Sequence, residues 1–545
     1  MSLAMLDRWW ARAVLVLVVY VVAVAFADPG GSLGTDSGAK VATLQAMTDH
    51  GSLRPDIGYW AEDLDPDGIY HPYLDTRAND RDEWVGVTSL PMLVLSQPVA
   101  AVAGQRAALI WPMLGALLAA FAAADIAKRL GGGHASRRAF WVVAVASPVT
   151  IYALDFWEHA PGTGLMVAGT AVMLRVTGSD RRWWMPLLAG VLFGAAGAMR
   201  SEAYIVGAVA VGLACLSLLR TDRLAALRAG VTALAGFAAV FLSNAMLETT
   251  LGGNSRASRA SGQAGRDPFD RLGQRLSDSA MTWFGGPTGS VAAAIALGAV
   301  FACLVVCAVV LIRRGDDRRA RIAMVGAGGV MAVVLLGGPG FVPGALIASP
   351  VVLATPGLAR LDRERGYVLT VALVSTVLIW AYQILDAAGP QWGGRYLLAP
   401  TILLTALGAV ALDDLPAWFR RSVIGLALVV TMFGVVWLSV RTHDVSRFFD
   451  ALGSRPEPVL IASDGFLIRE GGAAGLDEQW LSLGRGEPFI GALDIAEAAG
   501  VDRIGLVSPV AEPPERPGWT AIATTELELL DGPYYVHTFR LAATP

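Results

Sequence analysis

Long apolar runs recur along this chain, and their length constrains the fold more than any other feature. Each run has roughly 15 to 24 residues, which as a helix is enough to cross the hydrocarbon core of a bilayer. Helices suit that environment because they make all their backbone hydrogen bonds within the segment. The chain is 54% hydrophobic and only 16% charged, whereas soluble domains are about 25% charged. The sequence therefore predicts a polytopic α-helical membrane protein and excludes an ordinary soluble one.

The apolar runs predict about thirteen transmembrane helices. The expected spans are 13–27, 107–127, 139–154, 161–176, 184–199, 203–219, 229–246, 289–312, 322–337, 341–358, 367–385, 397–412 and 423–440. The apolar segment 85–103 is not counted, because Pro91 and Pro98 interrupt it and an interior proline removes a helical hydrogen bond. We interpret that segment as an interfacial or re-entrant helix.

The distribution of charge predicts which loops lie on which side of the membrane. With the N-terminus in the cytoplasm, every short inner loop is rich in Lys and Arg, as the positive-inside rule requires. Residues 28–106 and 441–545 then lie outside. Both are acidic: residues 28–90 carry twelve Asp and Glu against four Lys and Arg, and the tail carries sixteen against eight. An acidic outer surface argues against nucleic acid as a partner.

Two domains are expected on this basis. Residues 1–440 form a transmembrane domain with a large external loop at 28–106, and residues 441–545 form a small extracytoplasmic α/β domain. The segments PVLIASD, RIGLVSP and YYVHTFRLA are typical of strands, and ALDIAEAAG is typical of a helix. The tail contains no phosphate-binding loop, nucleophile elbow or metal-spaced Cys and His set. We therefore expect it to recognise an acceptor or to support a site in the membrane domain.

The first candidate site residue is Asp36, which follows the first apolar segment in the stretch GTDSGAK. A carboxylate just above the membrane surface can act as a general base, taking the proton from a hydroxyl that attacks a sugar carbon. Alternatively, Thr35 or Asp36 is the N-cap of a helix, with Lys40 one turn further on. The two interpretations are compatible.

The second candidate site is the motif DFWEH, which occupies a loop of a few residues between two apolar segments. It holds three ionisable groups, Asp155, Glu158 and His159, whose oxygen and imidazole ligands could bind Mg²⁺ or Mn²⁺. Trp157 among them could stack on a sugar ring. Alternatively the loop is simply polar, with its acidic residues placed to complement a helix dipole.

Four motifs in the observed order resemble those of the membrane-embedded glycosyltransferases of the C type, the GT-C superfamily. An acidic residue, Asp36, lies in the long first external loop. The acidic motif DFWEH lies in the short external loop between helices 3 and 4, GVLFGAAGAMRSEA joins two helices, and WGGRYLLAP opens a late helix. Ser37 stands where the best-known members have a second acidic residue. Of the 42 basic residues only Lys40 and Lys128 are lysines, which is typical of GC-rich bacterial genomes such as those of actinobacteria.

The resemblance implies a role for each candidate residue. Asp36 would be the catalytic base. Asp155 and Glu158 would assist catalysis or, with His159, bind a metal. Arg200 and Arg395 would hold the lipid phosphate of the donor. The full set of substrate-binding candidates is Lys40, Trp157, His159, Arg200, Glu202 and Arg395. Alternatively, each of these two arginines extends to the membrane interface, or pairs with Glu202 or Asp386.

The sequence thus predicts an integral glycosyltransferase of the plasma membrane. It would move a hexose or pentose from a polyprenyl-phosphate donor to an envelope glycan or glycolipid on the outer face, and a divalent cation, Mg²⁺ or Mn²⁺, is the candidate cofactor. A transporter or flippase of lipid-linked sugars is the main alternative, but such proteins place ionisable groups near the bilayer midplane, where this sequence has few. A non-catalytic envelope scaffold is the third class.

Overall fold

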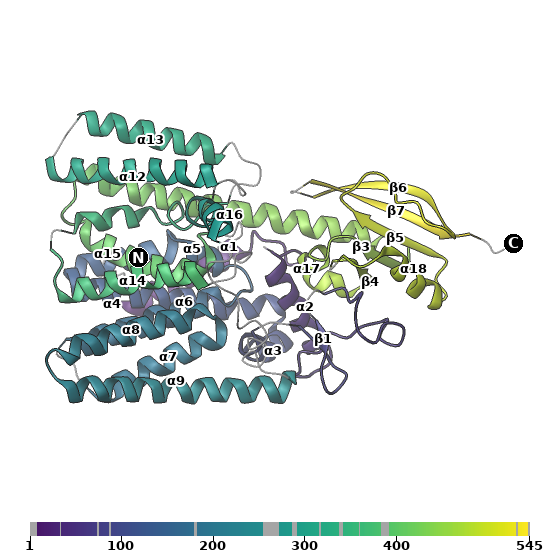
Figure 1. The fold of residues 1–545 in the computed structure, drawn as a ribbon, viewed down its shortest axis with the longest axis horizontal. Coiled ribbons are helices and arrows are strands. Elements are labelled where there is room, and N and C mark those ends of the chain that lie inside the picture. The colour runs from purple at the N-terminus through teal and green to yellow at the C-terminus, as the bar shows by residue number, and fades with distance from the viewer. Residues whose placement is uncertain are drawn as a thin grey trace.

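The computed structural model has a helical part and a C-terminal domain that contains a β-sheet (Figure 1). It describes residues 8–32, 34–73, 76–86, 89–178, 182–253, 272–285, 291–314, 318–336, 342–358, 360–382, 392–484, 486–529 and 532–542. The long helices of the helical part are α1 (Trp9–Val24), α4 (Ile110–Val145), α6 (His159–Thr177), α7 (Trp184–Met199), α8 (Glu202–Leu219), α9 (Arg223–Gly252), α12 (Val291–Arg314), α13 (Arg318–Leu336), α14 (Arg363–Tyr382), α15 (Leu398–Ala411) and α16 (Ala417–Gly453). Further helical segments are α2 (Thr35–Asp49), α3 (Leu90–Ala103), η1 (Gln105–Leu109), α5 (Pro148–Tyr152), α11 (Leu272–Phe284), η2 (Pro350–Gly357) and η4 (Arg395–Leu397).

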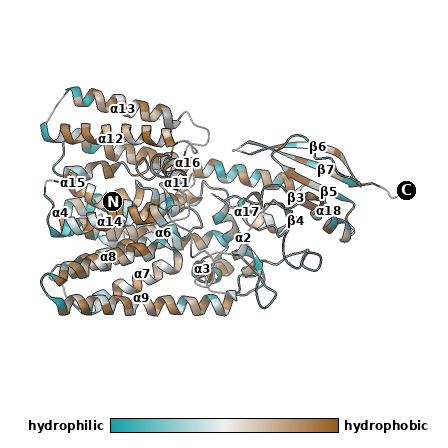
Figure 2. Cartoon of the chain, in the orientation of Figure 1, coloured by the Kyte–Doolittle hydropathy of each residue, from teal (hydrophilic) through white to brown (hydrophobic). Residues whose placement is uncertain are grey.

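Within the described residues, five helical segments are long and apolar enough to cross a membrane, and further apolar helices are shorter. Hydrophobic residues dominate the helical part along its length (Figure 2). Many large apolar side chains of α9, α13 and α16 are exposed, among them Leu234, Val325 and Val429, as expected for helices that face lipid. The polytopic membrane fold predicted from the sequence is therefore confirmed.

Helix α4 covers most of the predicted span 107–127 and the first part of the predicted span 139–154, which continues past Val145. Its backbone leaves the helical region at Gly132, where φ is 81° and ψ is −167°, a conformation that glycine adopts without steric cost. The rings of Phe121 and Phe140 lie 4.9 Å apart, although nineteen residues of straight helix would separate them by about 28 Å. The chain therefore folds back at Gly132 into a helical hairpin, as the separate spans 107–127 and 139–154 predict.

The predicted span 341–358 does not form a regular helix. Its described residues run as irregular chain into the short 3-10 helix η2, which contains Pro350 and Pro356. Prolines lack the backbone N–H that a helix needs. The irregular chain is buried, since Val351 and Ala354 are fully enclosed, and Gly408 of α15 leaves room for the backbone oxygen of Val351. Non-helical chain at membrane depth is tolerated when protein surrounds it.

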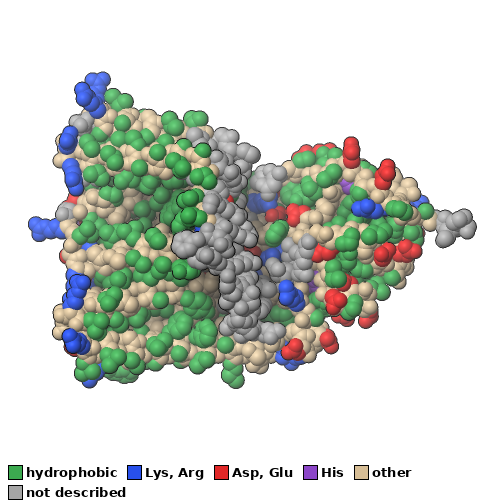
Figure 3. Space-filling model, viewed as in Figure 1, with side chains coloured by type: hydrophobic (Ala, Val, Ile, Leu, Met, Phe, Trp, Pro, Cys, Tyr) green, Lys and Arg blue, Asp and Glu red, His purple; other side chains and the backbone are tan. Residues whose placement is uncertain are grey.

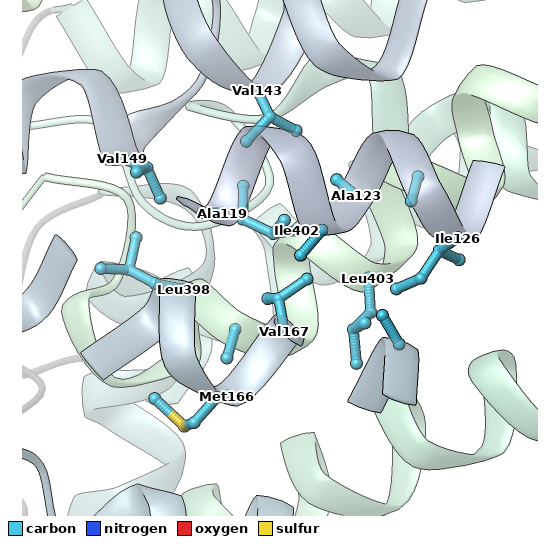
Figure 4. Packing of buried hydrophobic residues seen from close by; sticks show 14 of the residues in the cluster. Ala119, Ala123, Ile126, Val143, Val149, Met166, Val167, Leu398, Ile402 and Leu403 are labelled. Atoms are coloured by element: carbon cyan, nitrogen blue, oxygen red, sulfur yellow. The ribbon is translucent and has the colours of Figure 1, made fainter. Parts of the chain in front are cut away.

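Small residues let the central helices α4, α6 and α15 approach closely. Figure 4 shows Ala119, Ala123, Val167, Ile402 and Leu403 among the side chains that fill the space between them. A Cβ at Gly164 of α6 would overlap the backbone oxygen of Gly115 of α4. This packing is typical of membrane helices, whose association depends on close van der Waals contact.

The C-terminal domain is built on a five-stranded sheet with the order β4-β3-β5-β7-β6. Its elements are β3 (Val459–Ala462), α17 (Leu467–Glu470), η5 (Gly472–Leu476), β4 (Gln479–Ser482), α18 (Phe489–Ala498), β5 (Arg503–Ser508), β6 (Trp519–Leu529) and β7 (Gly532–Leu541). Strand β3 pairs in parallel with β4 and β5, while β7 is antiparallel to β5 and β6. The expected strands β3, β5 and β7 and the helix α18 are present; β4 and β6 are additional.

Helix α16 joins the two parts without an irregular linker. It continues to Gly453, so the residues after the predicted boundary at 440 remain helical and extend toward the sheet (Figure 1). The external loop 28–106 contributes α2, α3 and the short antiparallel pair β1 (Arg77–Ala78) and β2 (Trp84–Val85). The expected interfacial helix 85–103 corresponds to α3, which has 14 residues and is shorter than a membrane crossing needs.

The contact between α2 and the C-terminal domain depends on Gly38. A Cβ at this position would overlap the backbone oxygen of Arg469 in α17. We therefore predict that Gly38→Ala lowers the free energy of unfolding by about 1–3 kcal/mol, as overpacking does, and increases hydrogen exchange in residues 467–476. Gly212→Ala is the matched control, because an added Cβ at Gly212 meets no neighbour within 4 Å. Equal thermal stability of the two variants would contradict this view of the contact.

Candidate active site

Asp36 lies in the first turn of α2, but its side chain does not cap the helix. The N-cap residue is Gly34, and the Ser37 hydroxyl donates to its backbone oxygen at 2.9 Å. The Asp36 carboxylate is held by two arginines instead: Arg395 Nη1 lies 2.7 Å from Oδ2, and Arg469 Nη2 lies 2.9 Å from Oδ1. The N-cap alternative for Asp36 and Thr35 is therefore wrong.

The surroundings of Asp36 stabilise its ionised form. Burial by itself would raise the pKa of this carboxyl group. The positive charges of Lys40, Arg395 and Arg469 outweigh that effect and hold the pKa well below its usual range. Asp36 is therefore a carboxylate at any pH at which the protein works.

A second chain of ion pairs begins one helical turn after Asp36. Lys40 Nζ lies 2.7 Å from Glu158 Oε2, and Arg200 Nη1 lies 3.2 Å from Glu158 Oε1. Arg200 also pairs through Nε with Glu202 Oε1 at 3.0 Å, as one of the alternatives for Arg200 predicts. Together the paired residues form what we call the charge cluster: Asp36, Lys40, Glu158, Arg200, Glu202, Arg395 and Arg469.

Five separate parts of the chain bring the charge cluster together. Asp36 and Lys40 lie on α2, and Glu158 precedes α6. Arg200 and Glu202 lie at the junction of α7 and α8, Arg395 begins η4, and Arg469 lies on α17 of the C-terminal domain. The alternative pairing of Arg395 with Asp386 concerns a residue outside the described part of the chain.

An aromatic group lies against the charge cluster. The His159 ring stacks on Tyr152 with centroids 5.0 Å apart and meets the edge of Trp157 at 4.6 Å. The guanidinium groups of Arg200 and Arg395 each lie 4.8 Å from the ring centroid of Tyr396. Cations over aromatic faces are attracted by the ring quadrupole, so the rings help to hold like charges close together.

Several buried polar atoms of this region have no hydrogen-bond partner among the described residues. They are both ring nitrogens of His159, Nε1 of Trp157 and Oε2 of Glu202. All three side chains are at most 2% exposed. Leaving buried donors and acceptors unpaired costs about 1–3 kcal/mol each, and native structures usually satisfy them with protein, water or ligand. These atoms can therefore bond to water or to a polar ligand.

Asp155 lines a pocket that Glu158 does not line. It lines a pocket of about 80 Å³ together with Val41 and Leu44 of α2, Arg106 and Leu438. The pocket has a largely apolar lining and lies between α1, α2, η1 and α16. Asp155 therefore borders this pocket, while Glu158 takes part in the charge cluster.

The predicted metal ligands do not form a metal site. In the described part of the chain, no group of three His, Cys, Asp or Glu residues is arranged to hold a metal ion. Glu158 is already neutralised by Lys40 and Arg200, and the His159 ring lies between aromatic neighbours. Asp155, Glu158 and His159 therefore do not fit the ligand set for Mg²⁺ or Mn²⁺ expected from their spacing.

Two residues of the site were not predicted from the sequence. Tyr396 follows Arg395 in the motif WGGRYLLAP, and its aromatic ring next to an arginine was a signal that could have been used. Arg469 lies in GFLIRE, 433 residues after Asp36. Nothing local distinguishes it from a surface arginine, so only the folded arrangement shows its contact.

Comparisons with known proteins find similar solved structures but no matching family model and no matching curated protein. Archaeoglobus fulgidus oligosaccharyltransferase tethered with an acceptor peptide is 12% identical, with a TM-score of 0.48, over 93% of this chain and 70% of that one. A complex of that organism's oligosaccharyltransferase with Zn and sulfate has a TM-score of 0.43 at 13% identity, over 90% and 67%. ArnT from Cupriavidus metallidurans bound to undecaprenyl phosphate has a TM-score of 0.43 at 12% identity, over 96% and 97%.

The buried position of Glu158 gives a prediction about stability. Glu158→Gln removes the carboxylate that pairs with buried Lys40 and leaves Arg200 paired with Glu202 alone. We expect the free energy of unfolding to fall by about 3 kcal/mol, which would lower Tm clearly in detergent. Glu364→Gln is the matched control, since Glu364 forms a more exposed pair with Arg129 and should cost under about 1 kcal/mol. A Glu158→Gln protein as stable as the control would show that the buried pairs do not support the fold.

Proposed function

We propose that this protein is an integral membrane glycosyltransferase. It transfers one hexose or pentose from a polyprenyl-phosphate donor to an envelope glycan or glycolipid. The observation that carries the proposal is the Asp36 carboxylate, held within a cluster of four cations beside buried aromatic rings and polar atoms that lack partners. Such a site offers a base, positive charge for a phosphate and a place for a sugar.

The donor would be bound by two parts of the site. Arg395 and Arg200 each present a planar set of five N–H donors, which suits the oxygens of a phosphate. The sugar would lie against Trp157 and His159, whose ring nitrogens would bond its hydroxyl groups. Glu202 offers an unpaired carboxylate oxygen as an acceptor for another hydroxyl.

In the reaction, an acceptor hydroxyl attacks C1 of the donor sugar while its proton passes to Asp36. A new bond forms between the acceptor oxygen and C1, and the bond from C1 to the phosphate oxygen breaks. Polyprenyl phosphate leaves with the electron pair and is stabilised by arginine. A carboxylate held by several cations is a weak base. A phosphate bound at Arg395 would neutralise part of that positive charge, which would raise the pKa of Asp36 and make it a stronger base.

The charge distribution supports an active site on the outer face. Lys and Arg gather at the end of the helical part furthest from the C-terminal domain, whereas Asp and Glu are prominent on that domain (Figure 3). The positive-inside rule assigns the basic end to the cytoplasm. The charge cluster, which includes Arg469 of the C-terminal domain, then lies at the outer end of the helices.

The proposal predicts that Asp36→Asn abolishes transfer without unfolding the protein. We expect kcat to fall at least about 100-fold, as loss of a general base does. The measurement is transfer from a panel of labelled polyprenyl-phosphate sugars by purified protein in nanodiscs. Asp49→Asn is the matched control, because Asp49 ends the same helix, is exposed and only accepts a hydrogen bond from Gln45.

Two outcomes would contradict the proposal in different ways. Equal kcat in the wild type and Asp36→Asn would remove Asp36 as the base. No transfer from any donor, with movement of labelled lipid between leaflets instead, would favour a transporter or flippase. Neither transfer nor movement would favour an envelope scaffold.

The metal prediction is tested in the same assay. Because Asp155, Glu158 and His159 do not form a ligand set, we expect transfer to persist in EDTA. If EDTA abolishes transfer and Mg²⁺ or Mn²⁺ restores it, this expectation is wrong and a divalent cation takes part in the reaction.

A further inference from the structure

Arg469 is the direct contact between the C-terminal domain and the proposed base. Its Nη2 lies 2.9 Å from Asp36 Oδ1, while Arg395 occupies Oδ2 from the membrane side at 2.7 Å. The Arg469 side chain is only 12% exposed. The carboxylate is thus held at both oxygens by guanidinium groups from different domains.

The helix that carries Arg469 is fixed from several sides. The Ser32 hydroxyl donates to the backbone oxygen of Glu470 at 2.6 Å, and Arg441 of α16 pairs with the Glu470 side chain at 2.6 Å. The Tyr73 hydroxyl donates to the backbone oxygen of Gly472 at 3.0 Å. The external loop and α16 therefore hold α17 against α2, where Gly38 allows its backbone to approach.

We propose that Arg469 is a positioning residue for Asp36, so that the C-terminal domain completes the active site. This inference rests on the glycosyltransferase function proposed above. Two charge-assisted hydrogen bonds to different oxygens fix the orientation of a carboxylate, whereas Arg395 alone leaves the other oxygen unrestrained. Neighbouring residues must hold a catalytic group in place, because a small displacement of that group greatly lowers the reaction rate.

The C-terminal domain then has a role that its own sequence does not reveal. It need not bind a reactant or contain a nucleophile, because it acts through one guanidinium on a residue of the membrane domain. Both oxygens of the Asp36 carboxylate are held only when α17 packs against α2, because Arg469 lies on α17. Any change that lifts α17 from α2 should therefore slow the transfer step.

The test compares Arg469→Gln, Arg469→Lys and Gly38→Ala with the wild type in nanodiscs. We expect Arg469→Gln to lower kcat about 30-fold, with KM for the lipid donor changed less than about twofold, because the group acts on the base and not on the donor. Arg469→Lys keeps the charge and should recover at least about a third of the wild-type kcat. Gly38→Ala, which displaces α17 and leaves every charge in place, should also lower kcat.

Arg503→Gln is the matched control, because Arg503 is in the same domain and pairs with Glu457 at 3.5 Å. It should leave kcat and KM unchanged. The proposal is overturned if Arg469→Gln transfers sugar at the wild-type rate, or if its kcat falls and Arg469→Lys does not recover it while both variants keep the wild-type Tm. Failure of the wild type to transfer from any donor would instead refute the glycosyltransferase function itself.

Discussion

The Asp36 carboxylate between Arg395 and Arg469 is the interaction on which the proposed site depends. It joins the external loop, a late membrane segment and the C-terminal domain at one side chain. Bringing a carboxylate and two guanidinium groups out of water is costly unless each is paired. Both arginines are paired with Asp36, so the condition is met. Asp36 is then ionised but weakly basic unless a second anion, such as a phosphate, also binds to the arginines. Substrate binding and activation of the base can therefore be linked through Arg395.

The membrane helices provide the rigid support for this interaction. Their contacts are made by alanine and glycine, as between Gly115 of α4 and Gly164 of α6, and such close packing leaves little freedom. Irregular chain occurs beside the charge cluster, since the loop that carries Glu158 and the turn before Arg395 both depart from helix. Charges that would be unfavourable in lipid are thereby held at helix ends and paired with one another.

Much of the fold followed from the length of the apolar runs. Helix α7 agrees with the predicted span 184–199, and the hairpin within α4 agrees with two separate spans, although its second leg ends at Val145 and the span at 154. The span at 341–358 was wrong, because hydropathy detects apolar composition and does not detect that prolines and neighbouring helices allow irregular chain there. The continuation of α16 to Gly453 was missed for a related reason: helical structure can continue into water after the apolar run has ended.

The sequence by itself determined the membrane class and most of the residues that gather at the site, because side-chain type and local spacing are encoded in it. Asp36, Lys40, Glu158, Arg200 and Arg395 were all identified in this way. Only the tertiary structure decided their partners. It paired Glu158 with Lys40 and Arg200 and placed Arg469 on Asp36. Local patterns cannot specify such contacts, because ion pairs depend on distances in space between residues hundreds of positions apart.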